Sequence, residues 1–110
     1  MYQSFKNDYP VKLDKVKTIA DSLGPPMAME YSFRIAQEFV DAVVRVKDDE
    51  LIGALKIMRD KLNLVVEPAC GASLAGLLGP LKEMVAGKAV SIIACGSNIS
   101  FERYKNLIHD

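Results

Sequence analysis

Two short stretches of this 110-residue sequence combine residue types that could serve a ligand site. The first is CGSN at residues 95–98, which follows an apolar, β-branched run and precedes a helical pattern. In open α/β sheets, ligands bind beyond the carboxyl ends of the strands, near helix N-termini that offer free N–H groups. Gly96 would let the backbone approach a ligand closely, and we expect Cys95, Ser97 and Asn98 to point into the crevice. The alternative is a sharp turn with a buried cysteine, because glycine-containing loops between strands and helices are common.

The second stretch is VVEPACGAS at residues 65–73, which has the same form of a short apolar run followed by a helical pattern. Pro68 suits the first helical turn, where its missing N–H is not needed. Glu67 places a carboxylate at the end of the predicted strand, where it faces either a ligand or the helix N-terminus. Spacing alone favours a structural interpretation, in which Gly71 and Ala72 are small so that helices can pack closely.

The other reactive side chains fit simpler roles. His109 is the penultimate residue and is expected in a solvated tail. Cys70 and Cys95 together with this one histidine are too few for a tetrahedral zinc site. The acidic run at residues 48–50 suits the first turn of a helix, where the helix dipole favours carboxylates. We therefore predict no metal site.

The composition excludes several classes of protein. The 14 lysine and arginine residues balance 14 aspartate and glutamate residues, so a basic nucleic-acid groove is not expected. The sequence is 50% hydrophobic and 25% charged, as in ordinary globular proteins. Its apolar runs are shorter than the roughly 20 residues of a membrane span, and MYQSFKNDYP lacks the apolar core of a signal peptide. We therefore expect a protein of the reducing cytoplasm, without a disulfide.

Hydrophobic spacing and residue type predict alternating helices and strands. Residues 1–17 are polar and mixed and are predicted to form an extended lead-in. The predicted helices and helical turns span residues 18–24, 30–40, 48–62, 68–86 and about 100–108, and the predicted strands span residues 42–46, 64–66 and 89–94. We expect Asp48 to cap its helix, Pro80 to kink the helix at 68–86, and residues 89–94 to be buried on both faces. The inward residues expected of the last helix are Phe101, Tyr104, Leu107 and Ile108.

Strands alternating with helices predict an α/β fold, with a small, mostly parallel sheet flanked by helices. No repeat, low-complexity tract or long linker divides the chain, so residues 1–110 are expected to form a single domain, with residues 18–110 as its α/β part. A chain of this length can bury about two-thirds of its unfolded surface, which is enough for a core.

Together the two stretches resemble the serine/threonine dehydratases, which are pyridoxal-phosphate enzymes of the tryptophan-synthase-β fold type, also called fold type II. VEPACGAS at residues 66–73 and CGSNIS at residues 95–100 are similar to two loops of that family. PVKLDKVKTIADSLG at residues 10–24 resembles the segment that re-enters its large domain, and VDAVVRVKDDELIGAL at residues 40–55 resembles the next strand and helix. CGSNIS, with cysteine first, is similar to the liver-type L-serine dehydratase pattern. The resemblance implies a partial domain, the C-terminal part of the large domain.

The resemblance also implies cofactor-binding roles for the loop at residues 95–98. Cys95 matches the serine or cysteine that faces the pyridine nitrogen of the cofactor, and Gly96, Ser97 and Asn98 match the rest of that loop. A neutral thiol at Cys95 leaves the ring nitrogen largely unprotonated, which moderates the ring as an electron sink and suits β-elimination.

Further cofactor-binding roles fall on residues outside that loop. Glu67 matches the family's glutamate near the cofactor ring, and Gly71 and Ala72 match the small residues beside it. Ser22 stands where the family mostly has the glycine of Ala-Asp-Gly, beside the substrate end of the cofactor. A serine there is expected to restrict close approach of the backbone.

The catalytic lysine and the glycine-rich phosphate loop of the family have no convincing match here. The reaction needs a lysine that holds the cofactor as a Schiff base and moves the α-proton. Ser4-Phe5-Lys6 imitates the Ser-Phe-Lys of the family, but the family motif continues into Arg-Gly and lies far upstream of the segment that TIADSLG resembles. We therefore interpret the match as coincidence and assign no catalytic residue, although Lys6 is the Schiff-base lysine that the motif would name.

The resemblance implies the C-terminal portion of an L-serine/L-threonine ammonia-lyase that eliminates water to give a 2-oxo acid and ammonia, and that is inactive alone. Its partners would be an amino-acid substrate, a chain or segment supplying the lysine and phosphate loop, and other subunits of an oligomer. The alternative is a non-catalytic binding or regulatory module that keeps the fold and pairs with a partner chain. A small nucleotide-binding protein is disfavoured because GxGxxG and GxxxxGK[ST] are absent.

Overall fold

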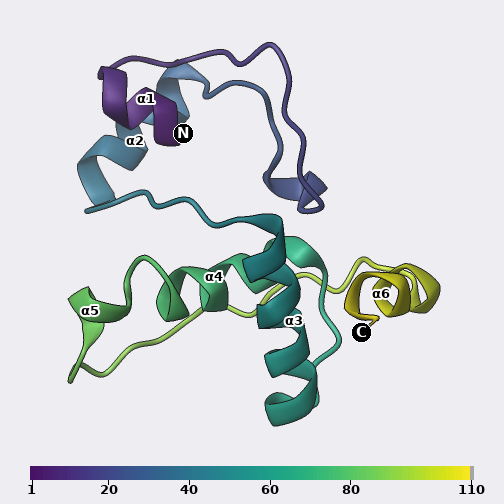
Figure 1. Ribbon diagram of the computed structural model, residues 1–110. Helices are drawn as coiled ribbons and strands as arrows, with labels where there is room; N and C mark the ends of the chain where they lie inside the picture. Colours follow the sequence, from purple (N-terminus) through teal and green to yellow (C-terminus); the bar gives the residue numbers. More distant parts are fainter. Residues whose placement is uncertain (110) are drawn as a thin grey trace.

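Two groups of helices make up the computed structural model, which describes residues 1–109. The elements are α1 (Tyr2–Asn7), the 3-10 helix η1 (Asp21–Leu23), α2 (Glu30–Phe39), α3 (Asp48–Leu62), α4 (Pro68–Leu78), α5 (Lys82–Val85) and α6 (Phe101–Ile108). Figure 1 shows α1 beside α2 in one group, and α3, α4 and α6 in the other. The second group carries most of the core and positions both stretches singled out above.

Helix α3 has the bounds that the sequence predicts. Its first turn is acidic, its last turn contains Arg59 and Lys61, and Asn63 ends it in the left-handed conformation with φ 54°. Such charges complement the helix dipole. The predicted capping role of Asp48 is wrong, because Asp48 is already the first helical residue and Lys47 is the N-cap residue. The Lys47 N–H donates to the Glu50 carboxylate.

Asp48 instead holds a distant segment against the start of α3. Its carboxylate accepts hydrogen bonds from the Thr18 hydroxyl at 2.7 Å and from the Ile19 N–H at 3.2 Å. The Thr18 hydroxyl in turn accepts a bond from the Ala20 N–H at 3.1 Å. These bonds fix the chain immediately before η1 to the start of α3, and η1 itself lies next to α4.

Helix α4 begins at Pro68, as predicted, but the single kinked helix expected at residues 68–86 is wrong. The helix ends at Leu78, and a separate short helix, α5, follows after a turn through Gly79 and Pro80. Pro80 has no N–H to continue the ladder, and Gly79 adopts φ −104° and ψ −106°, outside the helical region. The two together break the helix rather than bend it.

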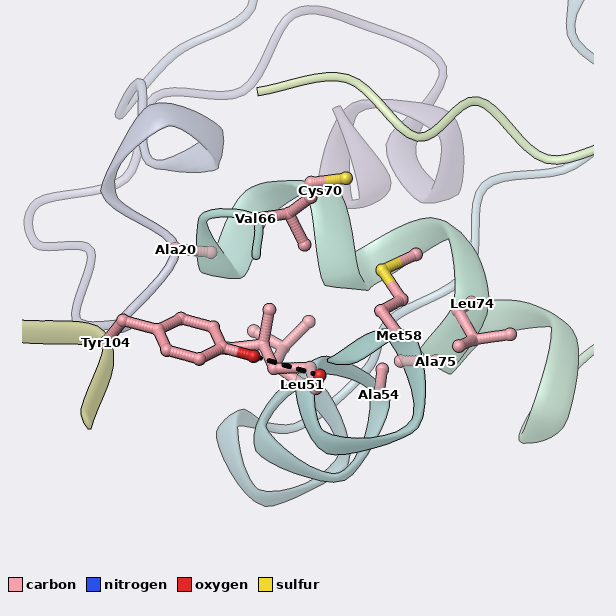
Figure 2. Packing of buried hydrophobic residues seen from close by; sticks show 10 residues of the cluster. Ala20, Leu51, Ala54, Met58, Val66, Cys70, Leu74, Ala75 and Tyr104 are labelled. Atoms are coloured by element: carbon pink, nitrogen blue, oxygen red, sulfur yellow. Dashed lines mark hydrogen bonds between the residues drawn. The ribbon is translucent and has the colours of Figure 1, made fainter. Parts of the chain in front are cut away.

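The core lies where α3 crosses α4 (Figure 2). Leu55 and Met58 of α3 are fully buried, and Tyr104 of α6 closes the cluster with 1% of its surface exposed. The other buried members of the cluster are Ala20, Leu51, Ala54, Val66, Cys70, Leu74 and Ala75. Burying each large side chain contributes about 1.5–3 kcal/mol to the free energy of folding. The crossing of α3 and α4 therefore stabilises the positions from which the neighbouring loops start.

The predicted parallel sheet is absent from residues 1–109. Residues 42–46, 64–66 and 89–94 are not helical, but none of them joins a strand ladder. An isolated antiparallel bridge pairs Lys12 with Met27. Residues 89–94 are also exposed apart from the half-buried Ile92, so their predicted burial on both faces is wrong. β-branched residues favour extended backbone, but a ladder requires neighbouring strands on which to form.

Two further predictions are corrected at the ends of the chain. The lead-in at residues 1–17 is not wholly extended, because α1 forms at Tyr2–Asn7 and packs the Phe5 ring edge-on against Phe33 of α2, with ring centroids 6.0 Å apart. Of the expected inward residues of α6, Tyr104 is buried and Leu107 and Ile108 are half-buried, whereas Phe101 is 70% exposed. Lys105 lies over that ring, with its Nζ 5.6 Å from the centroid.

Candidate functional site

Glu67 and the loop at residues 95–98 lie against each other, although 28 positions of sequence separate Glu67 from Cys95. Glu67 is the N-cap residue of α4, and its N–H donates to the Gly96 carbonyl at 3.1 Å. Gly96 has φ +100°, a conformation that side chains rarely permit. A Cβ atom at this position would lie 2.7 Å from Glu67 Oε1. The backbone conformation therefore favours glycine here, and a side chain at this position would have to displace the Glu67 carboxylate.

Ser22 belongs to the same cluster. Its hydroxyl donates to Glu67 Oε1 at 3.1 Å, which joins η1 to the start of α4. The sequence predicted that a serine here would restrict approach of the backbone to a ligand. The structure shows a different use of the side chain, because the hydroxyl holds the Glu67 carboxylate in place. Ser22, Glu67 and Gly96, which lie far apart in the sequence, are thus brought together.

The loop itself is open to solvent. Cys95, Gly96, Ser97 and Asn98 are all exposed, so the alternative of a turn with a buried cysteine is wrong. The Ile99 N–H donates to the Ser97 carbonyl at 2.8 Å, which tightens the loop just before α6. The four residues therefore present a thiol, a hydroxyl, an amide and backbone groups to solvent.

Gly71 and Ala72 serve the helix crossing. A Cβ atom on Gly71 would lie 3.3 Å from the Leu51 carbonyl oxygen and 3.4 Å from Leu55 Cδ2, so this glycine lets α3 and α4 approach closely. Ala72 is half-buried and packs against the core cluster. Their position agrees with the structural interpretation made from the sequence, and a role beside a cofactor stays a prediction for both.

Lys6 is not part of the cluster. It lies on α1, is exposed, and has its Nζ 5.9 Å from the centroid of the Tyr2 ring. Figure 1 shows α1 in the other group of helices, well separated from the start of α4 and from the chain leading into α6. The interpretation of the Ser-Phe-Lys match as coincidence stays a prediction.

Two residues that support the cluster were missed by sequence reasoning. The Ser73 hydroxyl shares its one proton between the Cys70 carbonyl at 3.0 Å and the Ile93 carbonyl at 3.1 Å, which attaches the chain before the loop to α4. Arg103 of α6 contacts Asp21 of η1 at 3.1 Å. A serine inside a helix often bonds the preceding turn, which was the available signal for Ser73. No local pattern marks the contact between Arg103 and Asp21.

The electrostatics of the cluster follow from these contacts. The hydrogen bond and the positive charge of Arg103 lower the pKa of Asp21 below its usual value. Burial raises the pKa of the Cys70 thiol, and the charges of Cys95 and Glu67 raise it further. Within residues 1–109, no three histidine, cysteine, aspartate or glutamate side chains are grouped so as to hold a metal ion.

Comparison with known proteins identifies the family. Residues 1–96 match the family model described as "Pyridoxal-phosphate dependent enzyme". The chain belongs to this family. It is 43% identical over 98 residues to phenylserine dehydratase from Ralstonia pickettii, covering 89% of this chain and 30% of the relative. It is 38% identical over 106 residues to L-threo-3-hydroxyaspartate ammonia-lyase from Saccharomyces cerevisiae, covering 96% of this chain and 32% of the relative.

The fold agrees with this assignment. The structure matches threonine deaminase isoform 2 from Solanum lycopersicum with a TM-score of 0.84 at 29% identity, covering 96% of this chain and 31% of that one. The chain thus spans about a third of the length of the relatives it matches. The match supports the predicted relation to fold-type II pyridoxal-phosphate enzymes, although residues 1–109 carry no sheet of their own.

The cofactor of this family is pyridoxal phosphate, and the cluster fits one side of it. The loop at residues 95–98 is exposed, and the Glu67 side chain occupies the space beside Gly96; contact of Cys95 with the ring nitrogen stays a prediction. The Glu67 carboxylate is held by Ser22 at the edge of the loop. No helix among residues 1–109 has the length and apolar character needed to cross a membrane.

Proposed function

We propose that this chain forms the pyridine-nitrogen side of the cofactor site in an L-serine/L-threonine dehydratase, an ammonia-lyase that converts a β-hydroxy amino acid to a 2-oxo acid and ammonia. The observation that carries the proposal is that Ser22 bonds Glu67 and Glu67 in turn bonds Gly96, within the exposed loop at residues 95–98. The relatives named as dehydratases and ammonia-lyases act, by those names, on amino acids that carry a β-hydroxyl group.

Each residue of the cluster has a distinct task in this proposal. When bound, the cofactor supplies the electron sink for β-elimination. Cys95 faces the ring nitrogen with a neutral group and does not protonate it. Ser22 orients the Glu67 carboxylate beside the ring, and Gly96 keeps the space open that the carboxylate needs. Ser97 and Asn98 line the same edge of the site.

The lysine that holds the cofactor and the loop that binds its phosphate come from outside the cluster. Lys6 lies on α1 beside Tyr2, and the sequence contains no run of glycines. We therefore expect the 110-residue chain, mixed with pyridoxal phosphate and L-serine, to release no pyruvate. A visible absorption band and pyruvate release that Lys6→Ala abolishes would overturn this expectation.

A chimera tests the proposed function directly. This chain would replace the matched third of the Ralstonia pickettii phenylserine dehydratase, and 2-oxo acid and ammonia release would be followed with L-serine, L-threonine and phenylserine. We expect activity that survives Cys95→Ser and falls strongly in Cys95→Asp, because a carboxylate would accept a hydrogen bond from the protonated ring nitrogen and so stabilise that form. A folded chimera that binds the cofactor but is inactive with all three substrates would contradict the proposal.

A second candidate function is a non-catalytic module that pairs with a partner chain. It is supported by three large apolar side chains that are mostly exposed, Tyr31 at 76%, Phe39 at 73% and Ile93 at 77%, because such surface favours association. Sedimentation of the purified chain separates the two candidates: a fully monomeric chain at high concentration counts against obligate pairing. For either function we propose a cytoplasmic location, which the two free cysteines support.

A further inference from the structure

The two cysteines of the chain lie on facing elements beside the candidate site. Cys70 is in the first turn of α4 and has 4% of its surface exposed. Cys95 begins the open loop and is exposed, and both thiols are free. We infer that Cys70 and Cys95 form a redox-modification site, in which a small disulfide such as oxidised glutathione converts the two thiols reversibly into an intrachain disulfide.

Hydrogen bonds fix the register between α4 and the chain before the loop. Positions 67, 70 and 73 are spaced by three residues and therefore share one face of the helix. At one end of this face, the Glu67 N–H bonds the Gly96 carbonyl at 3.1 Å. At the other end, the Ser73 hydroxyl bonds the Ile93 carbonyl at 3.1 Å. The helix face and residues 93–96 consequently run side by side in opposite directions.

This register places Cys70 opposite the middle of the segment, where Cys95 lies. The charge of Cys95 contributes to the raised pKa of Cys70, after burial and ahead of the charge of Glu67, which agrees with this register. Figure 2 shows the Cys70 sulfur directed away from Leu51 and Tyr104. The thiol at position 70 is therefore covered, while its partner is open to solution.

The difference in exposure sets the order of the two exchange steps. The Cys95 thiolate attacks one sulfur of oxidised glutathione, forms a mixed disulfide and releases one glutathione thiolate. Cys70 then loses its proton and attacks the Cys95 sulfur, which forms the intrachain bond and expels the second glutathione thiolate. Two protein thiols are oxidised, one glutathione disulfide is reduced to two thiols, and the two protons pass to the released thiolates.

The modification itself is independent of the cofactor. Its consequence for the enzyme rests on the proposed function, because Cys95 is the residue that we place at the ring nitrogen. A disulfide to Cys70 would remove that thiol from the ring and fix the loop against α4. A test without pyridoxal phosphate therefore separates the failure of this inference from the failure of the proposed function.

The test incubates the reduced 110-residue chain with oxidised glutathione and follows its intact mass. We expect a transient glutathione adduct, then a monomer lighter than the reduced chain by two hydrogen atoms, with a cross-linked peptide that contains Cys70 and Cys95. Dithiothreitol should restore both thiols. Cys70→Ser should stop at the adduct on Cys95, and Cys95→Ser should leave Cys70 unmodified while the chain stays folded by circular dichroism.

The same reaction in concentrated urea gives the rate of the second exchange step in the unfolded chain, with which the rate in the folded chain is compared. The second step should be at least about tenfold faster in the folded chain, because folding holds the two sulfurs together. Three outcomes would overturn the inference: a stable adduct on Cys95 with Cys70 still reduced, disulfide-linked dimers through Cys95 alone, or equal rates in the folded chain and in urea.

Discussion

The Glu67 carboxylate fills the space that a side chain at position 96 would need. A Cβ atom there would lie 2.7 Å from Oε1 and 3.0 Å from the carboxyl carbon. The contact explains how η1, α4 and the loop before α6 are held in register, since Glu67 also bonds Ser22. It also makes Gly96 a position at which a substitution would disturb the cluster.

Gly96→Ala is expected to lower the free energy of unfolding by about 1–3 kcal/mol, because it combines an unfavourable φ with the clash against Glu67. Urea unfolding measures the loss. Gly87→Ala is the matched control, since Gly87 also has a positive φ, +74°. Apart from its chain neighbours, no atom of residues 1–109 would lie within 4 Å of a Cβ atom added at Gly87. Equal losses in the two variants would contradict the role given to Glu67, and Glu67→Ala should relieve part of the loss in Gly96→Ala.

Gly71→Ala is expected to lower the free energy of unfolding by about 1–3 kcal/mol, because the added methyl group meets the backbone of α3 at Leu51. Gly76→Ala on the same helix is the control. Its nearest neighbour would be Val44 Cγ2 at 3.8 Å, so the better helix propensity of alanine should stabilise the chain by up to about 1 kcal/mol. Thermal or urea unfolding of both variants measures whether the free energy of unfolding falls in Gly71→Ala and rises in Gly76→Ala. A destabilised Gly76→Ala with an unchanged Gly71→Ala would contradict the placement of Gly71 at the crossing of α3 and α4.

Tyr104→Phe is expected to cost about 1 kcal/mol, because it removes the hydrogen bond from the Tyr104 hydroxyl to the Leu55 carbonyl, 3.3 Å long, in the core. Burial raises the pKa of Tyr104. The protonated hydroxyl therefore stabilises the folded chain fully below the unfolded pKa of about 10, and this contribution is lost as the pH rises through the folded value. Unfolding measured from neutral to alkaline pH should show a steeper loss for the wild type than for the variant.

Arg103→Gln is expected to destabilise the chain slightly at neutral pH, by an amount that decreases with added salt, because its ion pair with Asp21 is exposed. Arg103 lowers the pKa of Asp21, so the stabilisation is present above the unfolded pKa of about 3.9 and is lost as the pH falls through the folded value. Melting temperatures of the two proteins should converge in acid. A difference that persists there would mean that Arg103 acts through its bond to the Ile19 carbonyl instead.

The sequence predicts those features of the fold that local patterns determine. The acidic first turn and apolar spacing of residues 48–62 identify α3 to the residue, and Pro68 identifies the start of α4. β-branched residues at 42–46 and 89–94 indicate extended backbone, but no local pattern says whether neighbouring strands are present to form a ladder. The expected burial of Phe101 fails for a related reason, because spacing marks one face of a helix without showing what covers it.

The candidate site was predictable as a set of residues but not as a geometry. The loops at residues 65–73 and 95–98 stand out by their glycine, proline and small residues. The bond from Glu67 to Gly96 joins these two loops across 29 positions of sequence, and the bond from Ser22 to Glu67 adds η1 across 45 positions. Contacts at such separations depend on the packing of α3 against α4, which residue types alone do not encode. The same packing assigns Gly71 to the helix crossing.

The run AVSIIA at residues 89–94, which is exposed apart from Ile92 and joins no strand ladder within residues 1–109, has a practical consequence for work with this chain. It contains no charge and no proline, and its backbone N–H and C=O groups, apart from the Ile93 carbonyl that accepts from Ser73, can template the same run in another copy. Lys88 is the charge that flanks its start and opposes such stacking. The concentration at which solutions turn turbid, rather than the melting temperature, will therefore set the shelf life of the purified chain.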